Sequence, residues 1–223
     1  MAGLHRKSVL HDRAESQVNL KALSTLLITA ESYDGAPAPQ RPLIDSRQFG
    51  MLLFIMTEVM FFASLVSAYL IIRSGLDEWP PWGQPRLPIW STAFNTAVLF
   101  SSGVAAYLAG RQFRTDLETA RRTLGIAVVL GTFFLVFQGY EWVQMLGFGL
   151  TMTSSTYGGL FYLIIGAHGV HVLGALIALA YTWMRMNPAQ ERPLTQGGAS
   201  AIRMLWYFVV GVWPILYVLV YLA

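Results

Sequence analysis

Long apolar stretches alternate with short polar connections along most of the chain. Each stretch reaches the roughly 20 residues that a helix needs to cross a hydrocarbon core of about 30 Å. The pattern therefore predicts an all-α polytopic membrane protein, a bundle of five transmembrane helices. The expected spans lie near residues 49–72, 88–110, 124–147, 156–184 and 202–223.

Composition agrees with this fold class and removes several kinds of redox centre. Of the 223 residues, 55% are hydrophobic and 12% are charged, whereas about a quarter of a soluble protein is charged. The chain has no cysteine, which excludes disulfides, thiolate copper centres, iron–sulfur clusters and c-type haem attachment. A redox metal would therefore need histidine.

The connections differ sharply in their content of lysine and arginine, which predicts the topology. All but two of the 15 basic residues lie before the first span or in the second and fourth connections. The other side carries only Arg73 and Arg86. Because positive loops stay inside, we expect a cytoplasmic N-terminus and an external C-terminus. An odd number of spans also places the two termini on opposite sides.

The chain divides into two predicted parts. Residues 1–47 form a cytoplasmic N-terminal extension, too short to bury a core of its own, and residues 48–223 form the five-helix transmembrane domain. Within the extension, residues 18–27 predict a short amphipathic piece on the membrane, and residues 34–42 a proline-rich linker. The apolar part, residues 22–30, resembles the core of a signal peptide, which we expect to be retained.

Small and aromatic residues give further expectations about packing. Ser102, Ala106 and Gly110 recur every four residues on the second span, and Gly174 and Ala178 do so on the fourth, so other helices can approach closely there. Pro214 is expected to bend the fifth span. The connection 77–90 holds four prolines and three tryptophans, so we expect it to lie flat at the outer interface.

Glu58 lies near the middle of the first span. A carboxylate at that depth costs about 2.5 to 3.5 kcal/mol on insertion scales, so it is by default a functional hypothesis. We expect it to be largely protonated at pH 7 unless another helix or a lipid headgroup supplies a partner. A neutral acid bonded to a neighbouring helix is an equally weighted structural interpretation. Its own helix offers only apolar neighbours at helical spacing, Phe54, Ile55, Phe61 and Phe62.

Three further intramembrane residues could carry chemistry. Glu141, in the third span, is flanked by Gln138 and Gln144 on a similar face, which favours hydrogen bonding between helices. His168 and His171 share one face of the fourth span and could ligate a metal, accept a proton or hold a neighbouring helix. A bis-histidine haem would need a histidine on a second span, and no other span has one. Interhelical hydrogen bonding is favoured.

Motifs of known catalytic sites are missing from the sequence, including nucleophile elbows, phosphate loops, zinc-protease helices and dinucleotide fingerprints. The residues alone therefore predict a five-helix membrane bundle with a buried acid, a histidine pair and no visible catalytic centre. Such a chain fits an accessory subunit or a carrier.

Several segments resemble one known family. They are TEVMFF at 57–62, LFSSG at 99–103, QGYEW at 138–142, YGGLFYLIIGAHGVHVLG at 157–174 and WYFVVGVWPILY at 206–217. Together they are similar to subunit III of the haem-copper oxidases, chiefly cytochrome c oxidase. The resemblance covers all five spans in family order, and the first motif and the HGxH run are the most specific. This chain looks like the five-helix form of the family.

The resemblance implies a non-catalytic subunit of a bacterial terminal oxidase in the inner membrane, with no metal or cofactor of its own. Haem and copper are expected in partner subunits, with subunit I and subunit II as partners and phospholipid bound. Glu58 corresponds to the family's buried, carbodiimide-reactive acid, expected to serve proton uptake or lipid contact. Glu141, His168 and His171 correspond to other intramembrane polar residues of the family. The subunit would support oxygen reduction and proton uptake by subunit I in respiratory electron transport.

The last span departs from the family pattern. Tyr207 and Val210 stand where most members have a histidine and an aspartate, and Pro214 replaces an apolar residue. These changes indicate a divergent bacterial branch. Alternatives remain open: subunit III of a quinol oxidase, a relative associated with nitric oxide reductase, a proton-coupled carrier using Glu58 and the histidines as a relay, or a membrane enzyme. A carrier usually shows repeated halves with interrupted helices, which this sequence lacks.

Overall fold

The computed structural model describes residues 19, 21, 23–25, 45–76, 79, 87–186 and 196–222. The chain forms two units, residues 1–43 and 44–223. In the first unit the described residues are helical, and the hydroxyls of Ser24 and Thr25 donate to the Lys21 carbonyl at 2.9 and 2.8 Å. The predicted linker, the rest of the amphipathic piece, the signal-like core beyond residue 25 and most of the connection 77–90 lie outside the described residues.

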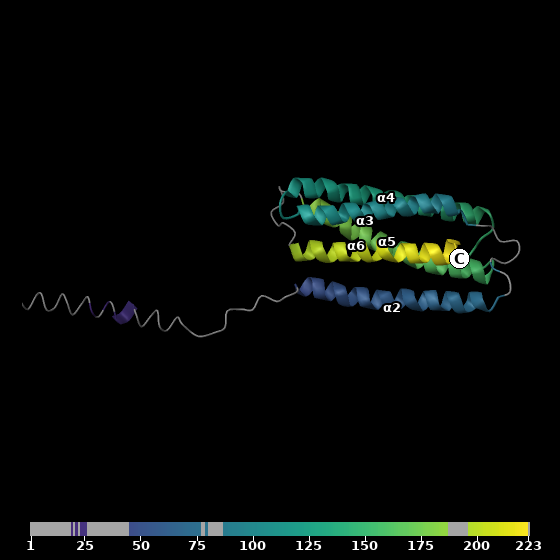
Figure 1. Cartoon of the computed structure of the whole chain (residues 1–223), viewed down its shortest axis with the longest axis horizontal. Coiled ribbons are helices and arrows are strands. Elements are labelled where there is room, and N and C mark those ends of the chain that lie inside the picture. Colours follow the sequence, from purple (N-terminus) through teal and green to yellow (C-terminus); the bar gives the residue numbers. More distant parts are fainter. Residues whose placement is uncertain are drawn as a thin grey trace, which may run out of the picture. The chain divides into compact units, whose positions relative to one another are not determined.

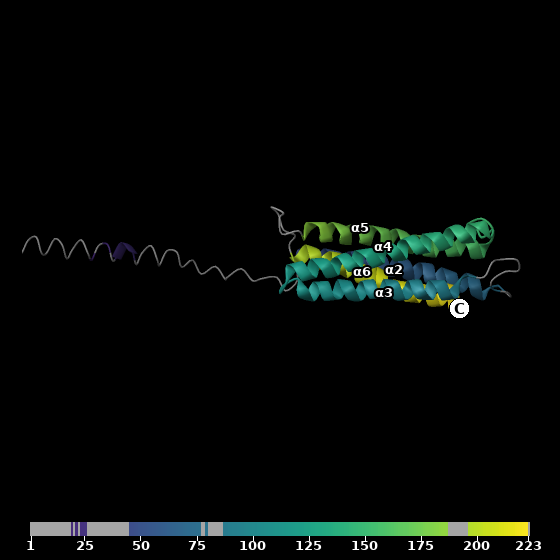
Figure 2. The ribbon, with the colours of Figure 1, turned by 90° about the horizontal axis from the view of Figure 1, so that it is seen from above.

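Five long helices make up the second unit, and Figure 1 and Figure 2 show them lying side by side. Each is long and apolar enough to cross a membrane, and the described residues contain no strand. The predicted all-α fold with five spans is therefore confirmed. The helices are α2 (Ser46–Ser74), α3 (Ile89–Gln112), α4 (Leu117–Gly147), α5 (Thr156–Arg185) and α6 (Gln196–Tyr217), the last continued by a π-helical turn η1 (Val218–Leu222).

Side-chain caps explain why some helices begin before their apolar stretch. Asp45 accepts from the Arg47 amide at 2.9 Å, Asp116 from the Thr119 amide at 3.1 Å, and Ser155 from the Gly158 amide at 3.0 Å. Each bond satisfies an amide that the first helical turn leaves unpaired. Helix α4 therefore starts at Leu117, well before its apolar part near residue 124.

Helix α3 packs most closely on α4 through its small residues. Ser102 and Ala106 are fully buried, and the Ser102 hydroxyl donates to the Ala127 carbonyl at 2.8 Å. Gly110 instead faces α6, where a Cβ would lie 2.9 Å from Nε of Arg203. The predicted strip on α3 thus contacts two helices.

The prediction that another helix approaches α5 closely at Gly174 and Ala178 is wrong within this chain. Gly174 is exposed, and a Cβ there would meet no atom within 4 Å. The close approach occurs on α4 instead, where a Cβ at Gly131 would lie 2.7 Å from Cη2 of Trp206. Trp206 is buried and needs a residue without a side chain opposite it, which Gly131 provides. A search for small residues spaced by four along one helix does not find such a position.

The C-terminal end of α6 changes helix type after Pro214. Proline has no amide hydrogen to donate within a helix, and four residues later the chain enters the wider π-helical turn η1. This turn carries Tyr221, which is 7% exposed and lies against Phe161 with ring centroids 6.0 Å apart. Wider turns of this kind are frequent at functional sites.

Helix α2 is the least buried of the five. Only Phe62 and Tyr69 on it are buried, and it packs mainly on α6 and to a smaller extent on α5. Met60 and Ile71 are 71% and 68% exposed. Trp79, just beyond α2, packs edge-on against Tyr69 with ring centroids 5.6 Å apart. Most of the α2 surface is therefore left for lipid or another protein.

Candidate functional site

Glu58 and His171 meet between α2 and α5. The Glu58 Oε2 atom lies 2.8 Å from Nε2 of His171, and Nδ1 of His171 lies 2.7 Å from the Ala167 carbonyl oxygen. A carbonyl only accepts hydrogen bonds, so Nδ1 carries a hydrogen. The contact between Oε2 of Glu58 and Nε2 of His171 then needs one proton, which either the carboxyl group or Nε2 carries. In both arrangements the pair is neutral overall, and one proton is shared between two helices.

Two phenylalanine rings of α2 lie beside this pair. The Phe62 ring lies edge-on to both His171 and His168, with centroids 5.2 and 6.2 Å apart, and Phe61 lies 5.8 Å from His171. The side chains of His171 and Glu58 are nevertheless 23% and 15% exposed. The pair therefore sits at the edge of the bundle, where a lipid or a partner protein can reach it.

His168 occupies a different environment from His171. It is 1% exposed and stacks on the Trp213 indole of α6, with centroids 5.1 Å apart and planes inclined at 27°. Neither ring nitrogen has a hydrogen-bond partner among the described residues. The interhelical hydrogen bond expected of the pair is thus made by His171 and not by His168, whose contacts are aromatic.

Glu141 belongs to a second polar cluster, between α3, α4 and η1. Its Oε2 atom accepts from the Thr92 hydroxyl at 3.0 Å and from Nε2 of Gln138 at 3.2 Å, and its Oε1 atom accepts from the Ser91 hydroxyl. Nε2 of Gln138 also donates to the Tyr221 hydroxyl at 3.2 Å. Glu141 is 3% exposed, and the described residues place no cation beside it. Three donors hold this carboxyl group instead.

The sequence prediction included Gln144 in this polar stripe, and that placement is wrong. Nε2 of Gln144 donates to the Tyr140 hydroxyl at 3.0 Å on the exposed side of α4. Each three-residue step on a helix turns by about 300°, so Gln138 and Gln144 lie about 120° apart around the axis. Only Gln138 faces the bundle together with Glu141.

Several residues that bond between helices were missed by the sequence analysis. Nδ2 of Asn95 donates to the Phe134 carbonyl at 3.1 Å, and Nε1 of Trp213 donates to the Thr96 hydroxyl at 2.8 Å. Thr92, Asn95 and Ser102 are all fully buried on one face of α3. Their spacing of three and seven residues is a helical signal that could have identified them.

The two residues that depart from the family pattern lie at different places in α6. Val210 is 7% exposed and packs on Gly103, where a Cβ would lie 3.1 Å from its Cγ1 atom. Tyr207 is half-buried and lies one helical turn after Arg203. An apolar side chain thus stands at the position where the family resemblance leads us to expect an aspartate, and it leaves little room for a side chain at Gly103.

The described residues contain no group of three or more acids or histidines that could hold a metal ion. Glu58, Glu141, His168 and His171 lie instead between helices of the bundle. The fold and these two clusters define the class: a multi-pass helical membrane protein with a protonatable pair at the edge of its bundle.

The family follows from comparison with known proteins. A family described as "Cytochrome c oxidase subunit III" matches residues 27–223. Similar proteins include cytochrome c oxidase subunit 3 of Synechocystis sp., 33% identical over 180 residues that cover 80% of this chain and 76% of the relative. The corresponding protein of Corynebacterium diphtheriae is 32% identical over 197 residues, or 82% and 93% of the two chains. The chain therefore belongs to the cytochrome c oxidase subunit III family, as its motifs predicted.

Proposed function

We propose that this chain is the non-catalytic subunit III of a bacterial haem-copper cytochrome c oxidase, bound to a subunit I and a subunit II that hold haem and copper. Membership of the family supports a place in an oxidase complex. The weakly covered surface of α2 supports a protein or lipid neighbour, because exposed Met60 and Ile71 lie on a helix that buries little inside the chain.

The proposed location is the bacterial inner membrane, with residues 1–47 in the cytoplasm and the C-terminus outside. Charge at the helix ends supports this orientation. At the end where α4 begins and α5 ends, the described residues include Arg121, Arg122 and Arg185, whereas Arg73 lies at the opposite end. Positive charge gathers on the cytoplasmic side of membrane proteins.

The Glu58–His171 contact of 2.8 Å is the observation that supports a role in proton uptake. The pair holds one proton without net charge, so it can exist at membrane depth at less cost than a lone carboxylate. Its partial exposure allows proton exchange with a neighbouring group. We propose that the pair exchanges a proton with subunit I or with a lipid headgroup beside α2, while His168 and the Glu141 cluster hold the helices in register.

The first test is extraction of the tagged chain from its native membrane in a mild detergent. A haem-copper catalytic subunit should copurify, and the preparation should consume oxygen when reduced cytochrome c is added. A homo-oligomer free of that partner would refute the proposal and favour a carrier. Oxygen consumption with a quinol but not with cytochrome c would contradict the assigned electron donor.

The second test replaces Glu58 by glutamine in the assembled complex. The amide keeps the volume and a hydrogen bond to His171, but it can no longer exchange a proton. Assembly should be retained while proton uptake and sustained turnover fall. The matched control is Glu118→Gln, which changes an exposed acid of α4. It should leave proton uptake and turnover unchanged. Loss of assembly in Glu58→Gln would show that the acid is structural.

A further inference from the structure

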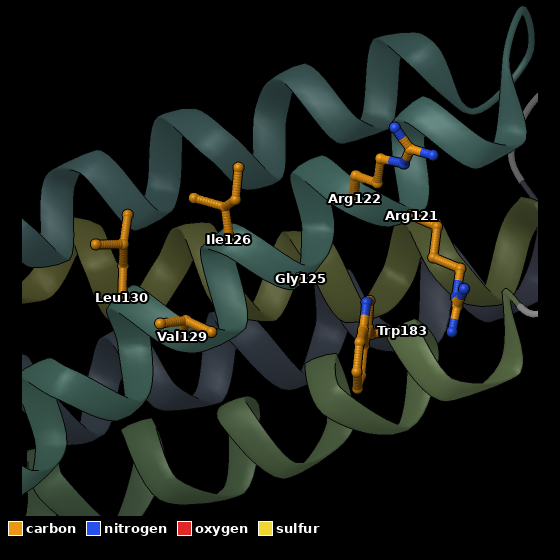
Figure 3. A pocket seen from close by; sticks show the side chains of 7 residues that line it. All are labelled: Arg121, Arg122, Gly125, Ile126, Val129, Leu130 and Trp183. Atoms are coloured by element: carbon orange, nitrogen blue, oxygen red, sulfur yellow. The ribbon is translucent and has the colours of Figure 1, made fainter.

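A groove of about 450 Å³ lies between α4 and α5, away from the residues of the proposed proton pair. Figure 3 shows its lining: apolar side chains of α4 along its length, and Arg121 and Trp183 together at one end. Ile126 and Val129 in this lining are 55% and 67% exposed. The groove therefore opens to the surroundings of the bundle.

Gly125 gives the groove its form. A Cβ at this position would lie 2.8 Å from Nε1 of Trp183, so any side chain would displace the indole. Without one, the edge of the indole rests against the backbone of α4. Within the described residues, the indole N–H has no hydrogen-bond partner. A donor thus lies in the groove lining beside Gly125, two residues before the end of α5, and tryptophan near a span end favours the layer between headgroups and hydrocarbon.

The same end of the groove is positively charged. The guanidinium carbon of Arg121 lies 5.6 Å from the centroid of the Trp183 ring, and its Nε atom is buried without a partner among the described residues. Arg122, which also lines the groove, has an exposed ion pair with Glu118 at 3.1 Å. Such exposed pairs are weak, so Arg122 can turn to another anion at little cost.

We propose that this groove binds one anionic phospholipid of the leaflet in which α4 begins. Its phosphate accepts from the guanidinium of Arg121 and from the indole N–H of Trp183, and one acyl chain lies along Ile126, Val129 and Leu130. Charge complementarity selects this occupant: the charged end meets a phosphate, and the apolar length beyond it suits an alkyl chain. A free phosphate would leave that apolar surface uncovered. The site is independent of the proposed role in proton uptake.

The selectivity test uses the full chain in nanodiscs of phosphatidylcholine that contain a small fraction of spin-labelled phosphatidylglycerol or, in parallel, spin-labelled phosphatidylcholine. We expect the motionally restricted population to favour phosphatidylglycerol by about fivefold for each arginine that contacts the phosphate. Arg121→Gln should remove most of this preference. Arg111→Gln changes an exposed arginine at the same end of the bundle, on α3, and should preserve it.

A second pair of variants tests the acyl-chain slot. Val129→Trp fills the slot from an exposed position and should lower the restricted population of both lipids. Val136→Trp is its control, because Val136 is also 67% exposed on α4 and lies outside the groove. Circular dichroism and gel filtration confirm that each variant is folded.

Three results would overturn the proposal. Equal loss of selectivity in Arg111→Gln and Arg121→Gln would show a general effect of surface charge. Equal effects of Val129→Trp and Val136→Trp would show that no acyl chain lies in the groove beside position 129. A photoreactive residue at position 129 that labels a protein and no lipid in the intact membrane complex would make the groove a protein interface. Copurification with an oxidase has no bearing on these results, so this proposal and the proposed function fail separately.

Discussion

Removal of the two members of the Glu58–His171 pair should destabilise the bundle unequally. His171→Leu leaves the carboxyl group of Glu58 without its 2.8 Å partner, on a helix whose residues one turn away, Phe61 and Phe62, offer no hydrogen bond. Glu58→Leu leaves a neutral imidazole whose Nδ1–H still donates to the Ala167 carbonyl at 2.7 Å. Only Nε2 then loses its partner. The histidine variant should therefore be the less stable of the two.

The magnitudes follow from the membrane setting. Hydrogen bonds between transmembrane helices contribute about 0.6 kcal/mol on average and up to about 1.7 kcal/mol, and a charge at the centre of a span costs about 2.5 to 3.5 kcal/mol. We expect His171→Leu to lower the free energy of unfolding by about 1.5 to 2.5 kcal/mol, which lies between the loss of one hydrogen bond and the burial of a full charge. Glu58→Leu should lower it by less than about 1 kcal/mol.

A double-mutant cycle measures the interaction itself. The four proteins are unfolded reversibly by sodium dodecyl sulfate in mixed micelles, and helicity is followed by circular dichroism. The coupling free energy should be about 1 to 1.5 kcal/mol. The exposed pair Glu118 and Arg122 is the control, with a coupling below about 0.5 kcal/mol. If the Glu58–His171 coupling is no larger than this control, the geometry of the pair does not describe an energetic interaction and the reasoning is refuted.

Three other predictions concern packing, the second polar cluster and a helix cap. Gly131→Ala should destabilise the bundle by about 1 to 3 kcal/mol because its Cβ would lie 2.7 Å from Trp206, whereas Gly139→Ala, with no atom within 4 Å, should not; detergent unfolding compares them. Glu141→Leu removes an acceptor shared by Ser91, Thr92 and Gln138, which leaves them only the Pro88 carbonyl and the Tyr221 hydroxyl as acceptors, and should cost about 1 kcal/mol. Glu141→Gln, which keeps an acceptor, should cost less in the same assay; equal losses would contradict the hydrogen-bonded cluster. The hydroxyl and then the amide of Thr119 lower the pKa of Asp116 at the start of α4, so the stabilisation from this cap is present above the ordinary aspartate pKa and disappears as the pH falls through the lowered one. NMR should show the Thr119 amide shift titrating below pH 4, a range set by the usual aspartate value of about 3.9, and Asp116→Asn should abolish the titration.

Hydrophobicity predicted the five spans because membrane insertion depends mainly on the length and polarity of each segment, which are local properties. The depth of Glu58 was predictable for the same reason. Its partner was not, because helical periodicity describes one helix and does not say which helices are neighbours. Sequence motifs identified His171 as a residue of interest, but only the packing of α2 on α5 brings its Nε2 atom to Glu58.

The second cluster shows where local reasoning fails. Glu141 and Gln138 were predicted to bond to another helix, and they do. The donor Ser91 lies at the start of α3, and Tyr221 lies in a π-helical turn that no residue pattern predicted. Gln144 was assigned to the wrong face because a separation of six residues falls short of two helical turns by about 120°. An error of one third of a turn decides which polar groups meet.

Helix α2 carries Glu58, whose contact with His171 also helps to attach the helix to the bundle. This helix buries little within the chain, and His171 contacts it near the middle of its span. Deletion of α2, or an apolar substitution of His171, would therefore change the attachment of the helix and the proposed proton exchange together. Glu58→Gln separates the two, because the amide preserves the contact while it removes the exchangeable proton. A functional loss in a complex that still assembles can then be assigned to the proton and not to the position of α2.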